Sequence, residues 1–312
     1  MNIVFLDVKT IGEDIDLSKF DLLGDVVKYD FTKLEQVPER VKEADVIILN
    51  KVQINEATIG EAERLKLVCV TATGTDNLDK EYLAQRKIEW RNVSGYSTES
   101  VAQHTFAMLF YLYEKLRYYD DYVKNEHYLN DKSFTHFENV FHDLSGKTWG
   151  IIGMGNIGRR VAKIAECFGC HVIYYSTSGK NNVDGYERVS WDELLDKSDI
   201  VSVHAPLNDQ TQDLMNLEAF QKMKREAFFL NLGRGAIVVE EDLLYALEHG
   251  LIKAAGIDVL RQEPMSEDNP LRKIKDSNKL LITPHIAWAS LEARTRLMDI
   301  IADQIKQFTE EN

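Results

Sequence analysis

Residues 153–158 read Gly-Met-Gly-Asn-Ile-Gly, and the segments around this motif constrain the fold more than any other part of the chain. A short apolar run, Trp149–Ile152, precedes it and is typical of a buried strand, while Arg159–Phe168 follows with the apolar spacing of a helix. A strand, three glycines at this spacing and a helix are typical of a dinucleotide-binding βαβ unit. The sequence therefore predicts an α/β domain with a parallel sheet.

The three glycines of this motif have different predicted roles. Gly153 permits the tight turn off the strand, Gly155 lets the backbone approach a pyrophosphate, and Gly158 lets the helix pack closely on the strand. The N-terminus of the helix adds unpaired N–H groups and a partial positive charge, which favour bound phosphate. The alternative is a turn that needs small residues only for packing, but the strand and helix on either side favour dinucleotide binding.

The next strand, His171–Tyr175, ends at the position that usually selects the coenzyme. NAD sites normally place Asp or Glu about 20 residues beyond the glycine motif, where the carboxylate binds the ribose hydroxyls. Here that position is Ser176, and Lys180 follows it closely. No carboxylate is present to repel a 2′-phosphate, and the hydroxyls of this segment together with Lys180 could receive one, yet no arginine offers the bidentate fork that favours phosphate. The sequence therefore allows NAD(H) or NADP(H).

Short apolar runs alternate with longer segments of helical spacing along most of the chain, which indicates parallel sheets built from βαβ units. A length of 312 residues predicts two domains. We expect two Rossmann-like, doubly wound α/β domains with a cleft between them: residues 1–100 with 285–312 as the substrate domain, and 101–284 as the dinucleotide-binding domain. Besides Trp149–Ile152, the predicted strands are Ile3–Leu6, Val46–Leu49, Leu67–Val70, Val172–Tyr175, Ile200–Val203, Phe228–Leu230, Ala254–Ile257 and Leu280–Ile282.

Two long helices and one loop complete the expected fold. A single helix is predicted from about Glu99 to His127, after Ser97 and Thr98, whose hydroxyls suit an N-terminal cap. The polar, aromatic-rich segment Asn130–Asp143 is expected to be a loop. A second helix, Leu291–Phe308, is expected to return to the first domain.

The charge and cysteine content restrict the partners. There are 37 Lys and Arg against 51 Asp and Glu, a net charge of −14, which disfavours nucleic acid and anionic membranes. The apolar runs are too short to span a bilayer, and the N-terminal ten residues carry no basic segment of a signal peptide. Only three cysteines are present, and none has metal-ligand spacing to a histidine or a second pair. We therefore expect a cytoplasmic protein without a metal site.

Polar residues follow three later strands where each strand ends. Arg234 stands between two glycines, Glu263 lies a few residues beyond Asp258, and His285 follows Pro284. Because ligands bind at the carboxyl ends of strands in open α/β sheets, we expect these side chains to meet at one edge. A cation that binds an anionic substrate and polarises its carbonyl, together with an imidazole backed by a carboxylate, suits proton delivery to a keto group.

With these residues in place, the chain resembles the D-isomer-specific 2-hydroxyacid dehydrogenase family over essentially its full length. Within the family it is most similar to glycerate dehydrogenases (hydroxypyruvate reductases), in Gly74–Asn77, in Gly95–Thr98 and above all in Pro284–Ser290. The other segments that carry the resemblance, in family order, are Thr71–Asn77, Val101–Thr105, the glycine motif, Val203–Leu207 and the three strand ends.

The resemblance implies roles for the three side chains at the strand ends. Arg234 would bind the substrate carboxylate and keto oxygen. His285 would exchange a proton with that oxygen as hydride moves to or from the nicotinamide. Glu263 would hydrogen-bond His285 and hold it in its protonated form. The reaction implied is hydride transfer between NAD(P)H and a small 2-keto acid, hydroxypyruvate or glyoxylate, to give a D-2-hydroxy acid.

The resemblance also implies binding residues. Backbone amides around Thr73 and Gly74 would hold the substrate carboxylate. Trp288 either limits substrate size or only fills the core. The coenzyme would contact Asn156 and Ile157 at the pyrophosphate, Leu232 and Asp258 at the nicotinamide, and His204 and Pro206 along its pocket.

Two alternative functions stay open, and the resemblance also implies an oligomeric state. The substrate could instead be D-lactate or a 2-hydroxy acid with a larger side chain. A different class is a dinucleotide-sensing, corepressor-like binding protein, which the complete Arg234, Glu263 and His285 set disfavours. The family pattern further implies a homodimer through Val101–Tyr119 and the loop that follows.

Overall fold

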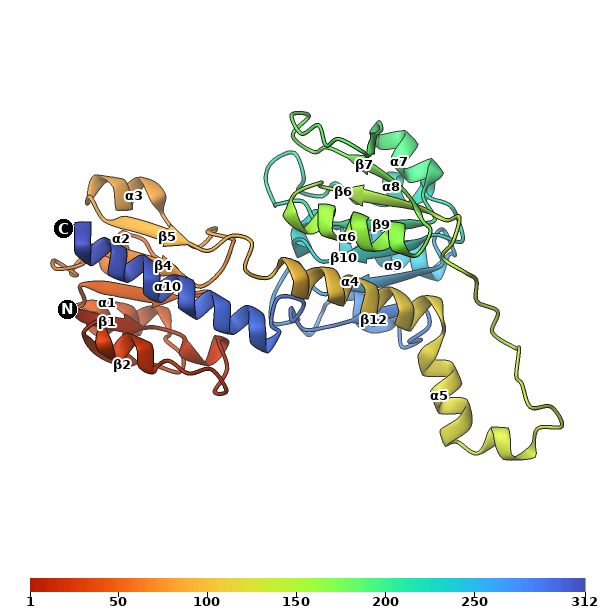
Figure 1. The fold of residues 1–312 in the computed structure, drawn as a ribbon, viewed down its shortest axis with the longest axis horizontal. Coiled ribbons are helices and arrows are strands. Elements are labelled where there is room, and N and C mark those ends of the chain that lie inside the picture. Colours follow the sequence, from red (N-terminus) through yellow and green to blue (C-terminus); the bar gives the residue numbers. More distant parts are fainter. Residues whose placement is uncertain (312) are drawn as a thin grey trace. The chain divides into compact units, whose positions relative to one another are not determined.

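A computed structural model of the protein describes residues 1–311 and divides them into two compact units (Figure 1). Unit 1 comprises Met1–Ser97 and the C-terminal segment that begins at Ala289. Unit 2 comprises Thr98–Trp288. Each unit has its own parallel sheet, so each is described by itself.

Unit 1 contains a five-stranded sheet in the order β2-β1-β3-β4-β5, with every pairing parallel. This order reverses direction beside β1, as in doubly wound sheets. The elements are β1 (Asn2–Phe5), β2 (Asp25–Lys28), β3 (Val46–Leu49), β4 (Leu67–Val70), β5 (Glu89–Asn92), α1 (Val37–Val41), α2 (Glu56–Ile59), α3 (Lys80–Gln85) and α10 (Leu291–Glu311), with 3-10 turns at Val8–Thr10, Ser18–Leu22 and Leu34–Gln36.

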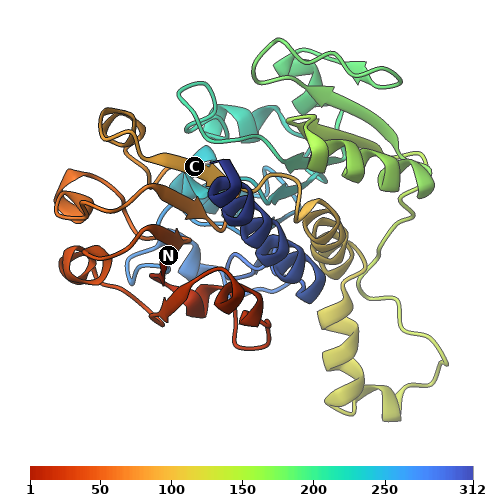
Figure 2. The same ribbon diagram turned by 60° about the vertical axis from the view of Figure 1, so that its left-hand side comes forward.

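The central strands of unit 1 are buried on both faces, because helices cover both. Helices α1 to α3 lie over the face that carries Ile47 and Val68. Helix α10 lies over the other face in both views of the ribbon (Figures 1 and 2). Two hydrogen bonds fix α10 along β5: Arg91 donates to the Gln304 carbonyl at 2.8 Å, and the Gln304 amide donates to the Asn92 carbonyl at 2.9 Å.

Unit 2 contains a seven-stranded parallel sheet in the order β12-β11-β10-β9-β6-β7-β8. Together the two sheets confirm the predicted α/β class with doubly wound parallel sheets. The elements are β6 (Thr148–Ile152), β7 (His171–Tyr175), β8 (Glu187–Arg188), β9 (Ile200–Val203), β10 (Phe228–Asn231), β11 (Ala254–Ile257), β12 (Leu280–Ile282), α4 (Thr98–Tyr113), α5 (Leu116–Lys124), α6 (Asn156–Cys167), α7 (Trp191–Lys197), α8 (Leu217–Lys222) and α9 (Glu240–Glu248), with 3-10 turns at His127–Asn130, Gly235–Ile237 and Pro270–Lys273.

Two hydrophobic layers enclose the sheet of unit 2. One packs α4 and α6 on the face that carries Trp149 and Leu230, and the other packs α7 to α9 on the face that carries Phe229. The strand order reverses between β6 and β9, which is the switch point where ligands bind in folds of this kind. The sheet therefore places its binding edge at the carboxyl ends of β6, β9, β10, β11 and β12.

The structure differs from the predicted elements in two respects. The expected single helix from Glu99 to His127 is wrong: α4 ends at Tyr113 and α5 starts at Leu116, because Lys115 adopts the left-handed conformation with φ of 55°. The Lys115 side chain is 7% exposed and its ammonium lies 5.6 Å from the Phe228 ring centre. Strands β2, β5 and β8 were not predicted, because their residues are mostly polar and lie at or near sheet edges.

Residues 116–143, here called the arm, extend away from the sheet of unit 2 (Figure 1). They comprise α5, a 3-10 turn at His127–Asn130 and a segment without regular structure, so the loop predicted at Asn130–Asp143 is present. Across residues 1–311, none of the helices has both the length and the apolar character needed to cross a membrane.

Candidate active site

The glycine loop lies at the switch point, between the end of β6 and the start of α6. Gly153 has φ of 94°, and a β-carbon there would lie 2.7 Å from the Ala205 backbone. A β-carbon on Gly158 would lie 2.3 Å from the Gly153 carbonyl oxygen. By contrast, a β-carbon on Gly155 would meet no described atom within 4 Å. Two glycines therefore permit close packing, and the third borders open space that a pyrophosphate can enter.

Helix α6 begins beside this open space. Gly155 is its N-cap and provides no side-chain hydrogen bond to the first turn. Asn156 is exposed and Ile157 is half-buried, so the first N–H groups of the helix border solvent. A helix N-terminus without a side-chain cap binds phosphate well, because both its N–H groups and its dipole favour an anion. The geometry fits the predicted coenzyme.

His204 follows β9 at the same edge. The Trp149 indole donates to Ser202 Oγ at 2.9 Å, and Ser202 Oγ lies 3.1 Å from His204 Nε2. His204 Nδ1 is shielded from solvent and has no hydrogen-bond partner among residues 1–311. Burial lowers the pKa of His204 to about 3, so the ring is neutral. An unpartnered ring nitrogen at this edge fits a pocket that is completed by a polar ligand.

Ser176 directly follows β7, where the adenosine ribose is expected. Its side chain is 4% exposed, and its hydroxyl has no partner in the described part of the chain. The Ser176 carbonyl accepts a hydrogen bond from the Gly179 N–H at 3.1 Å, which closes a tight turn. The ribose position thus presents a small turn and no acidic side chain.

His285 and Glu263 are adjacent at the ends of two neighbouring strands. His285 Nδ1 lies 2.7 Å from Glu263 Oε2, and the side chains are 24% and 31% exposed. The other oxygen of Glu263 accepts a hydrogen bond from the Leu260 N–H at 2.9 Å. The backbone after β11 therefore fixes the carboxylate, and the carboxylate in turn orients the imidazole.

Asp258 organises the loop that carries His285. Its carboxylate is buried and accepts hydrogen bonds from the Thr283 hydroxyl at 2.6 Å, the Ile286 N–H at 2.9 Å and the Ala287 N–H at 3.0 Å. The His285 N–H donates to the Asp258 carbonyl at 2.8 Å. These bonds hold His285 at φ of 55°, a left-handed conformation that is unfavourable for a residue with a β-carbon.

Arg234 projects from the loop after β10, and the Asn231 side chain holds this loop. The Asn231 amide donates to the Arg234 carbonyl at 3.0 Å, and its oxygen accepts from the Gly233 N–H at 3.1 Å. A β-carbon on Gly235 would lie 1.9 Å from the Leu260 carbonyl carbon. The arginine loop therefore packs directly on the backbone that binds Glu263.

The remaining predicted residues lie in different surroundings. Leu232 is buried, Pro206 is exposed, and Trp288 packs on the hydrophobic layer beneath α4 and α6. In unit 1, Thr73 and Gly74 follow β4; the Thr73 hydroxyl donates to the Val93 carbonyl at 3.0 Å. Thr73 and Gly74 lie toward the carboxyl end of their own sheet, so their role toward substrate stays a prediction.

The sequence analysis assigned no role to three residues that shape the site: Asn231, Thr283 and His104. Asn231 and Thr283 stand directly at strand ends, and that position is the signal which could have identified them. His104 Nε2 lies 3.1 Å from the Thr283 hydroxyl and 3.7 Å from Asp258. No sequence spacing links α4 to β12, so this contact required the structure.

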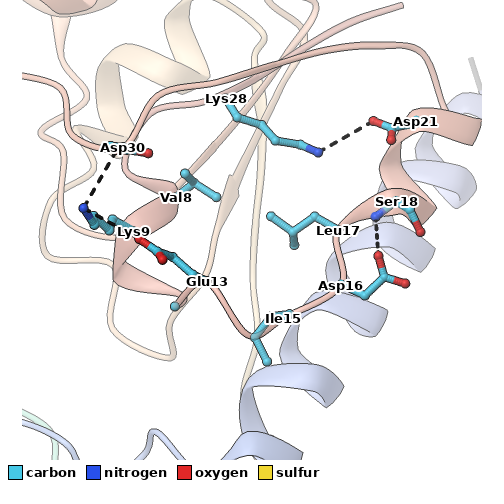
Figure 3. A pocket seen from close by; sticks show the side chains of 11 residues that line it. Val8, Lys9, Glu13, Ile15, Asp16, Leu17, Ser18, Asp21, Lys28 and Asp30 are labelled. Carbon is cyan, nitrogen blue, oxygen red and sulfur yellow. Dashed lines mark hydrogen bonds and ion pairs between the residues drawn. The ribbon is translucent and has the colours of Figure 1, made fainter.

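A separate cavity of about 410 Å³ lies in unit 1 near the ends of β1 and β2 (Figure 3). Five of its charged groups form ion pairs: Lys9 with Glu13 at 3.7 Å and Asp30 at 4.0 Å, and Lys28 with Asp21 at 3.7 Å. The sixth, Asp16, accepts a hydrogen bond from the Ser18 N–H at 2.9 Å. It contains none of the predicted site residues. No group of three or more His, Cys, Asp or Glu in residues 1–311 is placed to hold a metal ion.

A match to a known protein family identifies the class of enzyme. Residues 106–287 match the NAD-binding domain of the D-isomer specific 2-hydroxyacid dehydrogenases. The chain belongs to this family. The resemblance drawn from the motifs is confirmed, and so is the predicted class of enzyme, an NAD(P)-dependent D-2-hydroxyacid dehydrogenase.

Relatives in this family align over nearly the whole chain. Glycerate dehydrogenase from Methylorubrum extorquens is 34% identical over 307 residues, 98% of this chain and 95% of the relative. Hydroxypyruvate reductase from Blautia hydrogenotrophica is 34% identical over 315 residues, 99% and 97% of the two chains. Among solved structures, an acyclic imino acid reductase (Bsp5) in complex with NADPH and D-Arg is 30% identical, with a TM-score of 0.88 over 100% of this chain and 98% of that one.

The packing of Gly235 on Leu260 gives a first prediction. Gly235→Ala places a methyl group inside the backbone that anchors Glu263, so the two loops must separate. We expect a loss of about 1–3 kcal/mol in the free energy of unfolding, as for overpacking elsewhere, and a fall in kcat. Thermal unfolding and steady-state kinetics measure the two effects. A variant with unchanged melting temperature and kcat would show that the loops are not held together by this contact.

The neutral, shielded His204 predicts a pH dependence of stability. Its pKa is about 3 in the folded protein and near 6.5 when unfolded, so the unfolded chain binds the proton more strongly. The stabilisation from this group is present above pH 6.5 and is lost as the pH falls toward 3. The free energy of unfolding should drop by on the order of 1 kcal/mol more between pH 7 and pH 5 in the wild type than in His204→Asn. Equal drops would contradict the assignment.

Proposed function

We propose that the protein reduces a small 2-keto acid, hydroxypyruvate or glyoxylate, to the D-2-hydroxy acid with NAD(P)H. The observation that carries the proposal is the 2.7 Å contact between His285 and Glu263, at the sheet edge that also carries Arg234 and the glycine loop. The substrate class is supported by relatives named glycerate dehydrogenase and hydroxypyruvate reductase. Because the three cysteines are unpaired, we assign the reaction to the cytoplasm.

The side chains of unit 2 account for the steps other than hydride transfer. The reduced nicotinamide supplies the hydride when bound. Arg234 binds the substrate carboxylate and polarises the keto group, since a guanidinium presents two parallel N–H donors. Glu263 holds Nδ1 of His285, so Nε2 is the nitrogen left to donate a proton to the keto oxygen. Oxidation of the hydroxy acid uses the same groups, with His285 accepting the proton.

Replacing the proton donor tests this proposal. We expect His285→Ala to lower kcat by about two to four orders of magnitude, the usual contribution of a general acid. Coenzyme affinity, measured by nucleotide fluorescence, should stay unchanged because the glycine loop is intact. His249→Ala is the matched control: this histidine is exposed beyond α9, its Nδ1 lies 2.9 Å from the Tyr245 carbonyl oxygen, and its ring stacks on that of Tyr245.

Three results would contradict different parts of the proposal. Full turnover by His285→Ala would show that another group donates the proton. Tight nucleotide binding by the wild type, without reduction of hydroxypyruvate, glyoxylate, pyruvate or phenylpyruvate, would favour the dinucleotide-sensing alternative. Preference for pyruvate or phenylpyruvate within that panel would instead move the substrate to lactate or a larger hydroxy acid.

We further propose that the arm joins two copies of the chain in a homodimer. The arm exposes large apolar side chains, among them Phe134 (88% exposed) and Phe137 (77%). Such a patch on a monomer is typical of an interface, and identical chains most often pair about a two-fold axis. The family resemblance supports a second copy as the partner.

A charge placed on the arm should disrupt this dimer. We expect Phe134→Asp combined with Phe137→Asp to give a monomer in sedimentation equilibrium, with its circular dichroism unchanged. Phe31→Asp is the matched control, because Phe31 is also exposed (63%) but lies in unit 1. A wild type that is monomeric at micromolar concentration would overturn the proposed assembly.

A further inference from the structure

The turn after β7 lies beside an arginine that the sequence alone did not associate with it. Arg188 is the second residue of β8 and pairs with Tyr174, two residues before Ser176. Its Nη2 atom lies 3.8 Å from the place of a β-carbon on Gly179, so its guanidinium reaches the turn formed by Ser176–Gly179. The turn after β7 contains no arginine of its own. The parallel pairing of β8 with β7 therefore brings the Arg188 guanidinium to the expected ribose position.

Nothing within residues 1–311 neutralises this guanidinium. Arg188 is exposed and takes part in no hydrogen bond or ion pair with the other described residues. The neighbouring acid, Glu187, is directed elsewhere, since its carboxylate lies 3.7 Å from Nε2 of His171 at the start of β7. The segment between the two strands carries one further cation, Lys180, and one acid, Asp184, both exposed.

Gly179 keeps this guanidinium accessible. It has φ of 67°, a conformation that residues with a β-carbon rarely adopt, and it presents no side chain toward Arg188. Ser176, at the position where a carboxylate would bind the ribose hydroxyls and repel a phosphate, is uncharged and 4% exposed. The Ser176–Gly179 turn therefore has no acidic side chain, and beside it lies a guanidinium without a partner in the described part of the chain.

We propose that Arg188 binds the 2′-phosphate of NADPH and makes the protein prefer NADPH over NADH. This assignment rests on the proposed function only in that a nicotinamide dinucleotide occupies the glycine loop. A planar guanidinium binds a phosphate through two N–H donors, and such charge-assisted hydrogen bonds are among the stronger polar contacts in proteins. NADH has only a hydroxyl at this place, so Arg188 contributes little to its binding.

Equilibrium binding tests the proposal without turnover. Dissociation constants for NADPH and NADH are measured by nucleotide fluorescence, and those for 2′,5′-ADP and 5′-AMP by titration calorimetry. We expect the wild type to bind NADPH and 2′,5′-ADP more tightly than the partners without the phosphate. Arg188→Ala should weaken NADPH and 2′,5′-ADP by about tenfold to a hundredfold, the range for a hydrogen bond to a charged group. NADH and 5′-AMP should change by less than about twofold.

A matched variant separates a local contact from the overall charge of the unit. Arg225→Ala removes the same charge from an exposed residue just before β10, at the amino-terminal ends of the strands and so away from the glycine loop. This variant should leave all four dissociation constants unchanged. Equal weakening of NADPH and NADH by Arg188→Ala would overturn the assignment, as would a wild type that binds both equally. If the wild type binds both nucleotides equally and still reduces hydroxypyruvate, only the role of Arg188 fails. If it binds neither nucleotide, the proposed function fails as well.

Discussion

The buried carboxylate of Asp258 is the group on which the geometry of the reacting edge depends. Burying a charge is unfavourable unless it is fully hydrogen-bonded, and three donors from the Thr283–Ala287 loop satisfy this one. Because two of them are backbone N–H groups just after His285, the carboxylate fixes the chain in the turn that the histidine requires. The orientation of the imidazole is thus set from the end of the neighbouring strand, by a residue that is itself shielded from solvent.

A second set of contacts joins the three loops of this edge into one layer. Asn231 closes the arginine loop, Gly235 seats that loop on the Leu260 backbone, and the Leu260 N–H holds Glu263. Each contact involves backbone, so each loop is positioned by its neighbour and not by flexible side chains alone. Arg234, Glu263 and His285 therefore depend on the same register of adjacent parallel strands, which is set by the ladders from β10 to β12.

Much of this arrangement was predictable, for identifiable reasons. Central strands such as Val46–Leu49 and Ala254–Ile257 are buried on both faces, so their sequences are continuous apolar runs that give the correct bounds. The peripheral strands β2, β5 and β8 carry polar residues, so hydropathy does not identify them.

The break between α4 and α5 at Lys115 was not predictable, because a left-handed backbone conformation with a buried ammonium does not change the spacing of apolar residues. Strand ends indicated Arg234, Glu263 and His285, but the bonds of Asp258 to backbone groups more than 25 residues away could only be seen in three dimensions.

Strand β8 consists of two exposed residues, and in the described part of the chain it pairs only with β7. Both side chains are exposed, so substitutions there should change the free energy of unfolding little. His285, by contrast, is held by a network in which each change disturbs several others. A substitution in β8 can therefore change the turn after β7 without disturbing the hydrogen bonds that fix His285.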